Sequence, residues 1–297
     1  MLHSPLFFIY KFGMWSFHRI HASSIKKISK YITKIHNHKY PPILSVKCDI
    51  CELEINGCVV YSVTSKSVRK FKVNNAVLYI HGGGFINEIS NMHWSFIKKL
   101  AIESEATIYV PIYPLSKPEY SSINETFSLL EFIYEKIIID IPSSNVTIMG
   151  DSAGGNLTLA LGQKLKQNGS SKPKNLILIS PMLDMSESSA DKKKDSVISK
   201  ALIRAVEKWY LIDKKKNGKN FMYSPYYGDS LDIGYISIYV GSDEWLYPSC
   251  KNYNDKLNDK GITHDFIAMH KFFHDALIFS MPETKKYFSQ IINKITK

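Results

Sequence analysis

The chain has 297 residues, of which 44% are hydrophobic and 12% aromatic, so it can bury a large core and is not a disordered polypeptide. This length is within the range of a single α/β domain. The formal net charge is +11, from 38 Lys and Arg against 27 Asp and Glu, but the excess is mostly lysine scattered along the chain. No nucleic-acid-binding motif accompanies the basic residues, so we do not expect nucleic acid as a partner.

The first 40 residues are predicted to be helical and basic. Between Ile25 and Ile35 apolar residues recur at helical spacing, with lysines between them. Such a helix can simply pack on the rest of the fold, or it can serve as a lid or lie on a membrane surface. We favour the lid over the membrane helix, because the predicted strands begin directly after Pro41-Pro42.

Targeting signals are missing from the sequence pattern. No stretch reaches the roughly 18 apolar residues of a membrane span. The N-terminus lacks the basic region and small-residue cleavage site of a secretory signal. We therefore expect a soluble, cytoplasmic protein without stable membrane insertion.

Two strands follow, joined at Asn56-Gly57, a strong signal for a tight hairpin turn. Cys48 and Cys51 form a C-x-x-C in the first of them. Residues three apart in a strand point to opposite faces, so this pair is badly placed for a metal or a disulfide. We expect ordinary reduced cysteines and no metal site.

After the hairpin the chain alternates between strands and helices, which indicates a doubly wound, mainly parallel sheet entered by an antiparallel hairpin. The predicted strands are Ala76–Ile80, Thr107–Ile112, Val146–Met149, Asn175–Ile179, Ile236–Val240 and His264–Met269. The predicted helices are Met92–Glu103, Ser122–Ile138, Ala153–Gln167, Pro248–Lys260 and Pro282–Ile295. More than fifty residues separate the strands that end at Ile179 and begin at Ile236. Because that is too long for a plain loop, we expect an insertion with a helix near Val197–Ile212, as a second part of a lid.

Two glycine motifs each follow a predicted buried strand. The second, Gly150-Asp151-Ser152-Ala153-Gly154-Gly155, matches G-x-S-x-G, the strand–turn–helix elbow that presents a nucleophilic serine. The first, His81-Gly82-Gly83-Gly84, is a turn whose bare backbone N–H groups can approach a developing oxyanion. Together, in this order, they predict serine-based acyl transfer.

These motifs resemble those of the hormone-sensitive-lipase-like branch of the α/β-hydrolases, carboxylesterases and lipases with an H-G-G-G loop. Tyr113-Pro114-Leu115 and Ser180-Pro181-Met182-Leu183-Asp184 also resemble segments of that family. The resemblance runs from about Val59 to the C-terminus and implies a core with a two-part helical cap. The expected division is 1–42 for the N-terminal cap helices, 43–184 and 225–297 for the core, and 185–224 for the cap insertion.

Ser152 is the expected nucleophile, because the small residues around it tolerate the strained backbone of an elbow. The N–H of Ala153, at the start of the next helix, is expected to bind the oxyanion. By resemblance, Gly83 and Gly84 add two further donors, and His81 with Gly82 supports their loop.

The catalytic base has three late candidates, His264, His270 and His274. In this fold the histidine follows the serine and the acid, in the loop before the last helix. Family members carry it at a matching distance before a Pro-Glu, here Pro282-Glu283, which favours His274. The small residue and the phenylalanine that usually flank it are not reproduced here.

The acid is Asp243 or Glu244, which follow the strand that ends near Val240. A carboxylate of either type can hold an imidazole in one tautomer. The family pattern G-x-x-[DE]-x-L favours Glu244, spaced from Leu246.

The expected function is hydrolysis of small or short-to-medium acyl esters through an acyl-enzyme, without metal or organic cofactor. The expected partner is a small-molecule ester, and a homodimer is an open possibility. The alternatives are an amidase or arylformamidase on the same scaffold, or an inactive hydrolase fold that binds a ligand.

Overall fold

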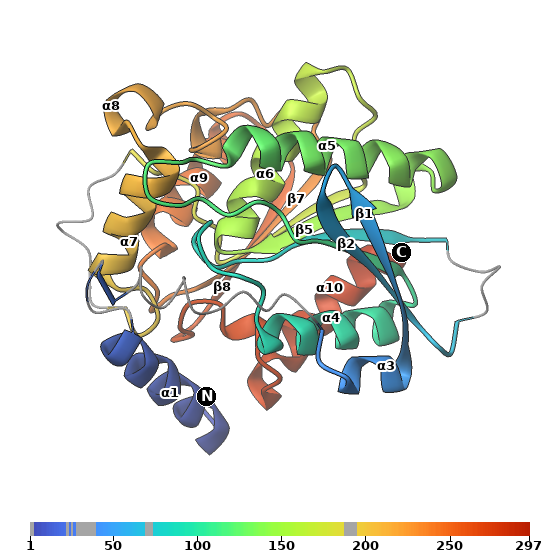
Figure 1. Ribbon diagram of the computed structural model, residues 1–297, viewed down its shortest axis with the longest axis horizontal. Helices are drawn as coiled ribbons and strands as arrows, with labels where there is room; N and C mark the ends of the chain where they lie inside the picture. Colours follow the sequence, from blue (N-terminus) through green and yellow to red (C-terminus); the bar gives the residue numbers. More distant parts are fainter. Residues whose placement is uncertain (1–2, 22–23, 25, 28–39, 69–73, 187–194) are drawn as a thin grey trace.

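A computed structural model of the chain describes residues 3–21, 24, 26–27, 40–68, 74–186 and 195–297 (Figure 1). These residues form an eight-stranded sheet with helices on both faces. The strands are β1 (Cys48–Ile55), β2 (Cys58–Ser65), β3 (Ala76–Ile80), β4 (Thr107–Pro111), β5 (Val146–Asp151), β6 (Asn175–Ile179), β7 (Tyr235–Gly241) and β8 (His264–Met269). The helices are α1 (Pro5–His21), α3 (Ile43–Lys47), α4 (Asn91–Ser104), α5 (Ile123–Asp140), α6 (Ala153–Gln167), α7 (Lys200–Val206), α8 (Lys214–Asn217), α9 (Tyr247–Asp259) and α10 (Lys285–Thr296).

The sheet has the strand order β1-β2-β4-β3-β5-β6-β7-β8. The pairs β1/β2 and β2/β4 are antiparallel, and every later pair is parallel. Asn56 and Gly57 turn the hairpin with φ values of 51° and 74°, which matches the twist of the strands they join. The predicted fold, a mainly parallel sheet entered by an antiparallel hairpin, is confirmed.

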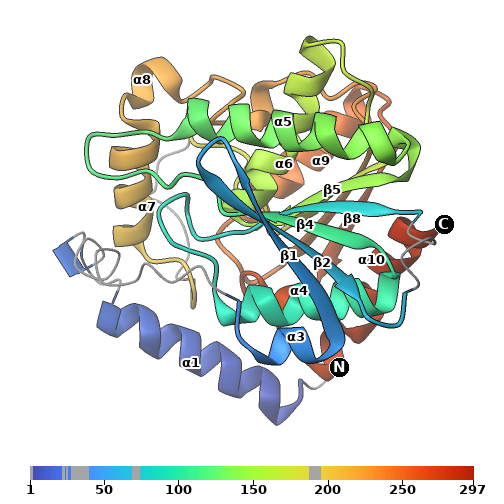
Figure 2. The ribbon, with the colours of Figure 1, turned by 45° about the vertical axis from the view of Figure 1, so that its right-hand side comes forward.

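The two faces of the sheet belong to two hydrophobic cores. In β3, Ala76 and Leu78 face the core shared with α5, α6 and α9, whereas Val77 and Tyr79 face the core shared with α4 and α10. Figure 2 shows these two helical layers above and below the strands. Alternation along a strand buried on both faces explains why β3 is continuously apolar.

The predicted elements occur with shifted ends. Strand β5 continues two residues beyond the predicted Met149, because Gly150 and Asp151 still pair with β6. The helix predicted near Val197–Ile212 starts later, as α7, and continues as a π-helix over Glu207–Leu211. The last helix is preceded by a 3₁₀ turn at Pro282–Thr284, where proline cannot donate a backbone hydrogen bond.

The predicted cap segments lie over different parts of the core. The helix predicted between Ile25 and Ile35 falls mostly outside the described residues. Helix α1 packs on the loop after β8, where Phe7 contacts the rings of Phe272 and Phe273 at centroid distances of 5.6 and 5.1 Å. In the predicted cap insertion, the ring of Tyr210 stacks on the ring of Phe85, with 3.7 Å between the ring centroids. Phe85 directly follows the His81–Gly84 motif, which we call the glycine loop. The division into a core and a two-part cap remains a prediction.

Helix α6 approaches β3 so closely that Gly154 has no space for a side chain. A Cβ there would lie 1.9 Å from the carbonyl oxygen of Ile80. We expect Gly154→Ala to lower the free energy of unfolding by about 1–3 kcal/mol or more, because the helix must shift off the sheet. Urea unfolding measures this. The control is Gly13→Ala on α1, where an added Cβ would have no described heavy atom within 4 Å. Equal stability of the two variants would contradict the prediction.

Candidate active site

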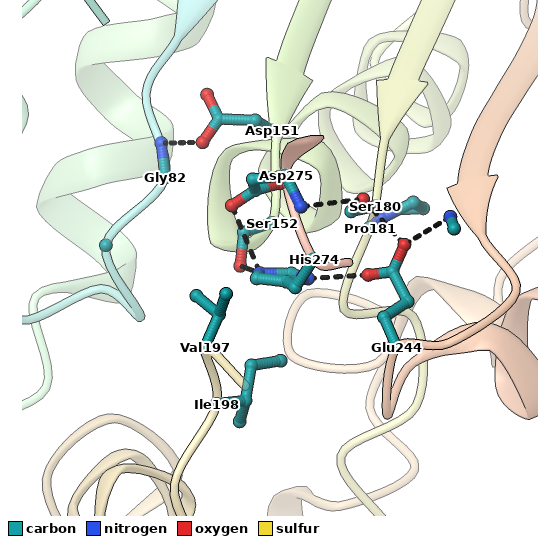
Figure 3. Close-up of polar contacts among 12 residues, drawn as sticks. Gly82, Asp151, Ser152, Ser180, Pro181, Val197, Ile198, Glu244, His274 and Asp275 are labelled. Atoms are coloured by element: carbon teal, nitrogen blue, oxygen red, sulfur yellow. Dashed lines mark hydrogen bonds and ion pairs between the residues drawn. The ribbon is translucent and has the colours of Figure 1, made fainter. Parts of the chain in front are cut away.

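Four loops meet at the carboxyl edge of the parallel sheet. The glycine loop follows β3, Ser152 follows β5, Glu244 lies after β7 and His274 lies after β8. Open α/β sheets bind their ligands at this edge, outside the carboxyl ends of the strands. Figure 3 shows the three side chains that the topology brings together.

Ser152 occupies a strained turn between β5 and α6. Its φ and ψ are 51° and −114°, a conformation that non-glycine residues rarely adopt. A hydrogen bond to the neighbouring strand β6 stabilises the turn, because the Ser152 N–H donates to the carbonyl of Ile179 at 2.8 Å. The serine side chain is thereby fixed at the end of β5, and the residue is 6% exposed.

A chain of hydrogen bonds links Ser152, His274 and Glu244 (Figure 3). His274 Nε2 lies 2.9 Å from Ser152 Oγ, and His274 Nδ1 lies 2.6 Å from Glu244 Oε2. Both members of the His274–Glu244 pair are almost fully buried. Since a carboxylate can only accept, it selects the tautomer with hydrogen on Nδ1, which leaves Nε2 able to accept from the serine hydroxyl.

Glu244 and Asp243 leave the chain in different directions. The Glu244 carboxylate turns inward, where Oε1 accepts from Ser180 Oγ at 2.8 Å and from the backbone N–H of Gly241. Asp243 points outward to Lys11 of α1, with 3.6 Å between the charged atoms. Of the two acids left open by the sequence, Glu244 is therefore the one beside His274.

The other two candidate histidines lie away from Ser152. His264 contacts the carbonyl oxygen of Ile262 and the side chain of Asn254, at 2.7 and 3.0 Å. His270 is exposed.

The glycine loop presents free backbone donors. Gly83 and Gly84 have φ values of 117° and 64°, so their N–H groups face a direction that other residues rarely allow. Among the hydrogen bonds of the described residues, none is donated by the N–H of Gly83 or Gly84. Ala153 is the first residue of α6, so its N–H has no carbonyl of the same helix to bond.

His81 stiffens this loop. Its Nδ1 donates to the Gly82 carbonyl at 2.7 Å, and its ring stacks on Tyr113 with centroids 4.4 Å apart. Tyr113 in turn donates its hydroxyl to the His81 carbonyl at 2.9 Å. Burial lowers the pKa of His81 to about 4, so the ring is neutral at physiological pH.

Asp151, for which the sequence suggested no role, joins the serine turn to the glycine loop. Its Oδ2 accepts from the Gly82 N–H at 3.0 Å and from His93 Nε2 at 3.1 Å, and Oδ1 accepts from the Tyr79 hydroxyl at 2.5 Å. Burial alone would raise the pKa of Asp151, but His93 and the Tyr79 hydrogen bond lower it below its usual value. Its place directly before the serine was the only signal in the sequence.

Asp275 is a second residue that sequence reasoning missed. Its Oδ2 lies 3.1 Å from His274 Nε2, the same atom that contacts Ser152. Its only signal in the sequence was its position directly after His274.

The described part of the chain contains neither a metal-binding cluster nor a membrane-spanning helix. There, no group of three or more His, Cys, Asp and Glu side chains is arranged to hold a metal ion. In the same residues no helix combines the length and hydrophobicity of a membrane span. Cys48 is buried and Cys51 exposed, so the C-x-x-C residues lie on opposite faces of β1, as its strand pattern predicted.

The sequence around these residues matches a known protein family. Residues 77–278 match the profile of the alpha/beta hydrolase fold family, a span that includes the serine, the acid and the histidine. The chain belongs to this family. Its resemblance to the hormone-sensitive-lipase-like branch is confirmed.

Relatives of this α/β-hydrolase include enzymes and solved structures. An esterase of Acinetobacter venetianus is 29% identical over 222 residues, which cover 72% of each chain. A Staphylococcus aureus protein described as an esterase superposes with a TM-score of 0.84 at 25% identity, over 96% of this chain and 99% of that one. The structure of an esterase from the bacterial hormone-sensitive lipase family has a TM-score of 0.80 at 20% identity, over 100% and 99% of the two chains, a likeness of fold.

Replacement of Asp151 tests the contacts that hold the two motifs together. We expect Asp151→Asn to lower the free energy of unfolding by about 1–3 kcal/mol for each buried donor left unpaired, because an amide NH₂ cannot accept from Tyr79, Gly82 or His93. Urea unfolding measures the loss. The matched control is Asp232→Asn, an exposed partner of Lys172, for which we expect a change within about 0.5 kcal/mol. Similar small effects at both positions would contradict the structural role of Asp151.

Proposed function

We propose that the chain is a serine carboxylesterase or lipase-like hydrolase that cleaves small or short-to-medium acyl esters through an acyl-enzyme. The observation that carries the proposal is the continuous hydrogen-bond chain from Ser152 through His274 to Glu244. The family membership and the esterase relatives support the same reaction.

Ester cleavage begins with the attack of Ser152 Oγ on the substrate carbonyl carbon. His274 Nε2 takes the serine proton as the bond forms, since it lies 2.9 Å from Oγ. The Glu244 carboxylate orients the ring and stabilises the imidazolium that results. Ser180 and the Gly241 N–H keep this carboxylate in place.

The negative charge that develops on the carbonyl oxygen is bound by backbone amides. In the proposed site these are the N–H groups of Gly83, Gly84 and Ala153, the last at the positive end of α6. Asp151 supports the arrangement because it binds Gly82 and directly precedes Ser152, so donors and nucleophile are held by one side chain.

Breakdown of the tetrahedral intermediate completes the cycle. His274 returns its proton to the departing alcohol, and a water molecule, activated by the same ring, then hydrolyses the acyl-enzyme. The cycle uses groups of this chain, the ester and one water molecule.

Apolar side chains surround the nucleophile on the cap side. Figure 3 shows Val197 and Ile198 beside Ser152 and His274. A side chain at Gly84 would meet Val206 and Leu202 of α7. These contacts favour an acyl group that is apolar and of limited length, because a longer one must displace part of the insertion.

The nucleophile is tested with Ser152→Ala. We expect the variant to fold as the wild type does and to lose hydrolysis of a short p-nitrophenyl ester, because no other group replaces Oγ. Circular dichroism checks the fold. A phosphonate inhibitor should label the wild type at Ser152 and leave the variant unlabelled. A folded variant with wild-type turnover would overturn the proposed function.

The acid is tested by comparing two neighbouring carboxylates. We expect Glu244→Gln to reduce turnover by on the order of 10⁴-fold, because an amide can hold the wrong imidazole tautomer and does not stabilise an imidazolium. Asp243→Asn removes one carboxylate from the adjacent position but affects only the contact with Lys11, so its turnover should stay close to that of the wild type. The reverse order of effects would assign the acid to Asp243.

A further inference from the structure

Asp275 has an unusual place beside the proposed catalytic histidine. It directly follows His274 and adopts a left-handed backbone, with φ of 56°. This conformation turns its side chain back over the imidazole, and its N–H donates to Ser180 Oγ at 3.2 Å. Figure 3 shows the contact of the Asp275 carboxylate with the His274 ring, beside the contact from Ser152.

Two oxygen atoms compete for one nitrogen. Ser152 Oγ and Asp275 Oδ2 lie 2.9 and 3.1 Å from His274 Nε2, while Glu244 occupies Nδ1. Nε2 carries at most one hydrogen. When that hydrogen points to Asp275, or a protonated Asp275 donates to Nε2, the ring has no free lone pair for the serine proton.

Few groups stabilise a negative charge on Asp275 other than the histidine. The Asp275 side chain is 14% exposed, and its Oδ1 is buried without a hydrogen-bond partner among the described residues. Two further carboxylates approach from the ends of other strands, Asp151 as the last residue of β5 and Glu244 after β7. Tyr79 of β3 and His93 of α4 lie behind Asp151 and bind it. Burial and the two neighbouring carboxylates therefore favour a proton that stays on the Asp275–His274 pair.

We propose that Asp275 is a positioning residue that holds a proton on the Nε2 side of His274, so that Ser152 is activated only after this shared proton has left. This role rests on the proposed function, because it regulates the base that the ester hydrolysis requires. When the proton has left, the ionised Asp275 stabilises the imidazolium that forms as Ser152 attacks. The pair therefore favours hydrolysis at alkaline pH.

The pKa shifts of Asp275 and His274 also favour hydrolysis at alkaline pH. Burial raises the pKa of Asp275 to about 7, against the opposing effect of His274. Burial alone would lower the pKa of His274, but the carboxylates of Asp275 and Glu244 raise it well above its usual value. A raised histidine pKa means that the base form appears only at higher pH, so activity is lost as pH falls through the pKa of the pair.

The experiment compares pH profiles of wild type, Asp275→Asn and Asp275→Gly. Asn and Gly both tolerate the left-handed backbone at this position. For each protein, kcat/KM for p-nitrophenyl acetate and the rate of phosphonate labelling at Ser152 are measured from acid to alkaline pH. The control is Asp243→Asn, which removes an exposed carboxylate near the same loop.

We expect the acid limb of both profiles to move to lower pH in the two Asp275 variants, by about 1–3 units, the usual effect of a nearby opposite charge. The alkaline plateau should fall, because the imidazolium loses one stabilising charge. The limb of Asp243→Asn should not move. A lower plateau with an unmoved limb in both Asp275 variants would leave Asp275 a merely structural residue and overturn the proposal.

A different result would separate this proposal from the function on which it rests. Wild-type labelling of Ser152 with an acid limb at or below that of an ordinary histidine overturns the role of Asp275 alone. Absence of labelling at Ser152 in the wild type overturns the serine-hydrolase function, and the role of Asp275 with it.

Discussion

The close approach of α6 to β3 constrains the whole catalytic edge. With Gly154 against the carbonyl of Ile80, the chain must turn from strand to helix within one residue, and Ser152 takes up the strain of that turn. The turn is tolerable because the rest of the structure over-determines it, through the bond to Ile179 and the buried strands on either side. The serine therefore has one position, and the glycine loop, the acid and the histidine are arranged around it.

Buried charge is the second organising feature of this edge. Asp151, Glu244 and Asp275 end or follow different elements, and each is held by a histidine or by donated hydrogen bonds. A carboxylate removed from water is costly unless it is paired, so these contacts determine which protonation states the site can adopt. Asp151 accepts hydrogen bonds on both oxygens, whereas Asp275 contacts His274 through one oxygen and its other oxygen has no hydrogen-bond partner among the described residues. Two acids in one site are thereby suited to different roles.

Helix α1 connects the N-terminal part of the chain to the histidine. Phe7 packs against Phe272 and Phe273, the two residues before His274, and Lys11 pairs with the residue before Glu244. The backbone N–H of Ser4 also bonds to Glu283, after the same loop. The loop after the last strand carries the histidine, so this packing restricts the motion of the loop and helps to keep the imidazole aligned between acid and serine.

The sequence by itself determined the elements and the chemistry that depend on local patterns. Alternating strands and helices indicated the parallel sheet, and the two glycine motifs located the turn of Ser152 and the glycine loop beside it, because a strained turn requires small residues in a recognisable order. Only the tertiary structure decided which carboxylate faces His274. Asp243 and Glu244 are adjacent and chemically alike, and the direction of each side chain depends on the turn after β7 and on its partners Ser180 and Lys11. The contacts of Asp151 and Asp275 were likewise invisible in the sequence, since they join residues from separate strands whose proximity exists only at the folded edge of the sheet.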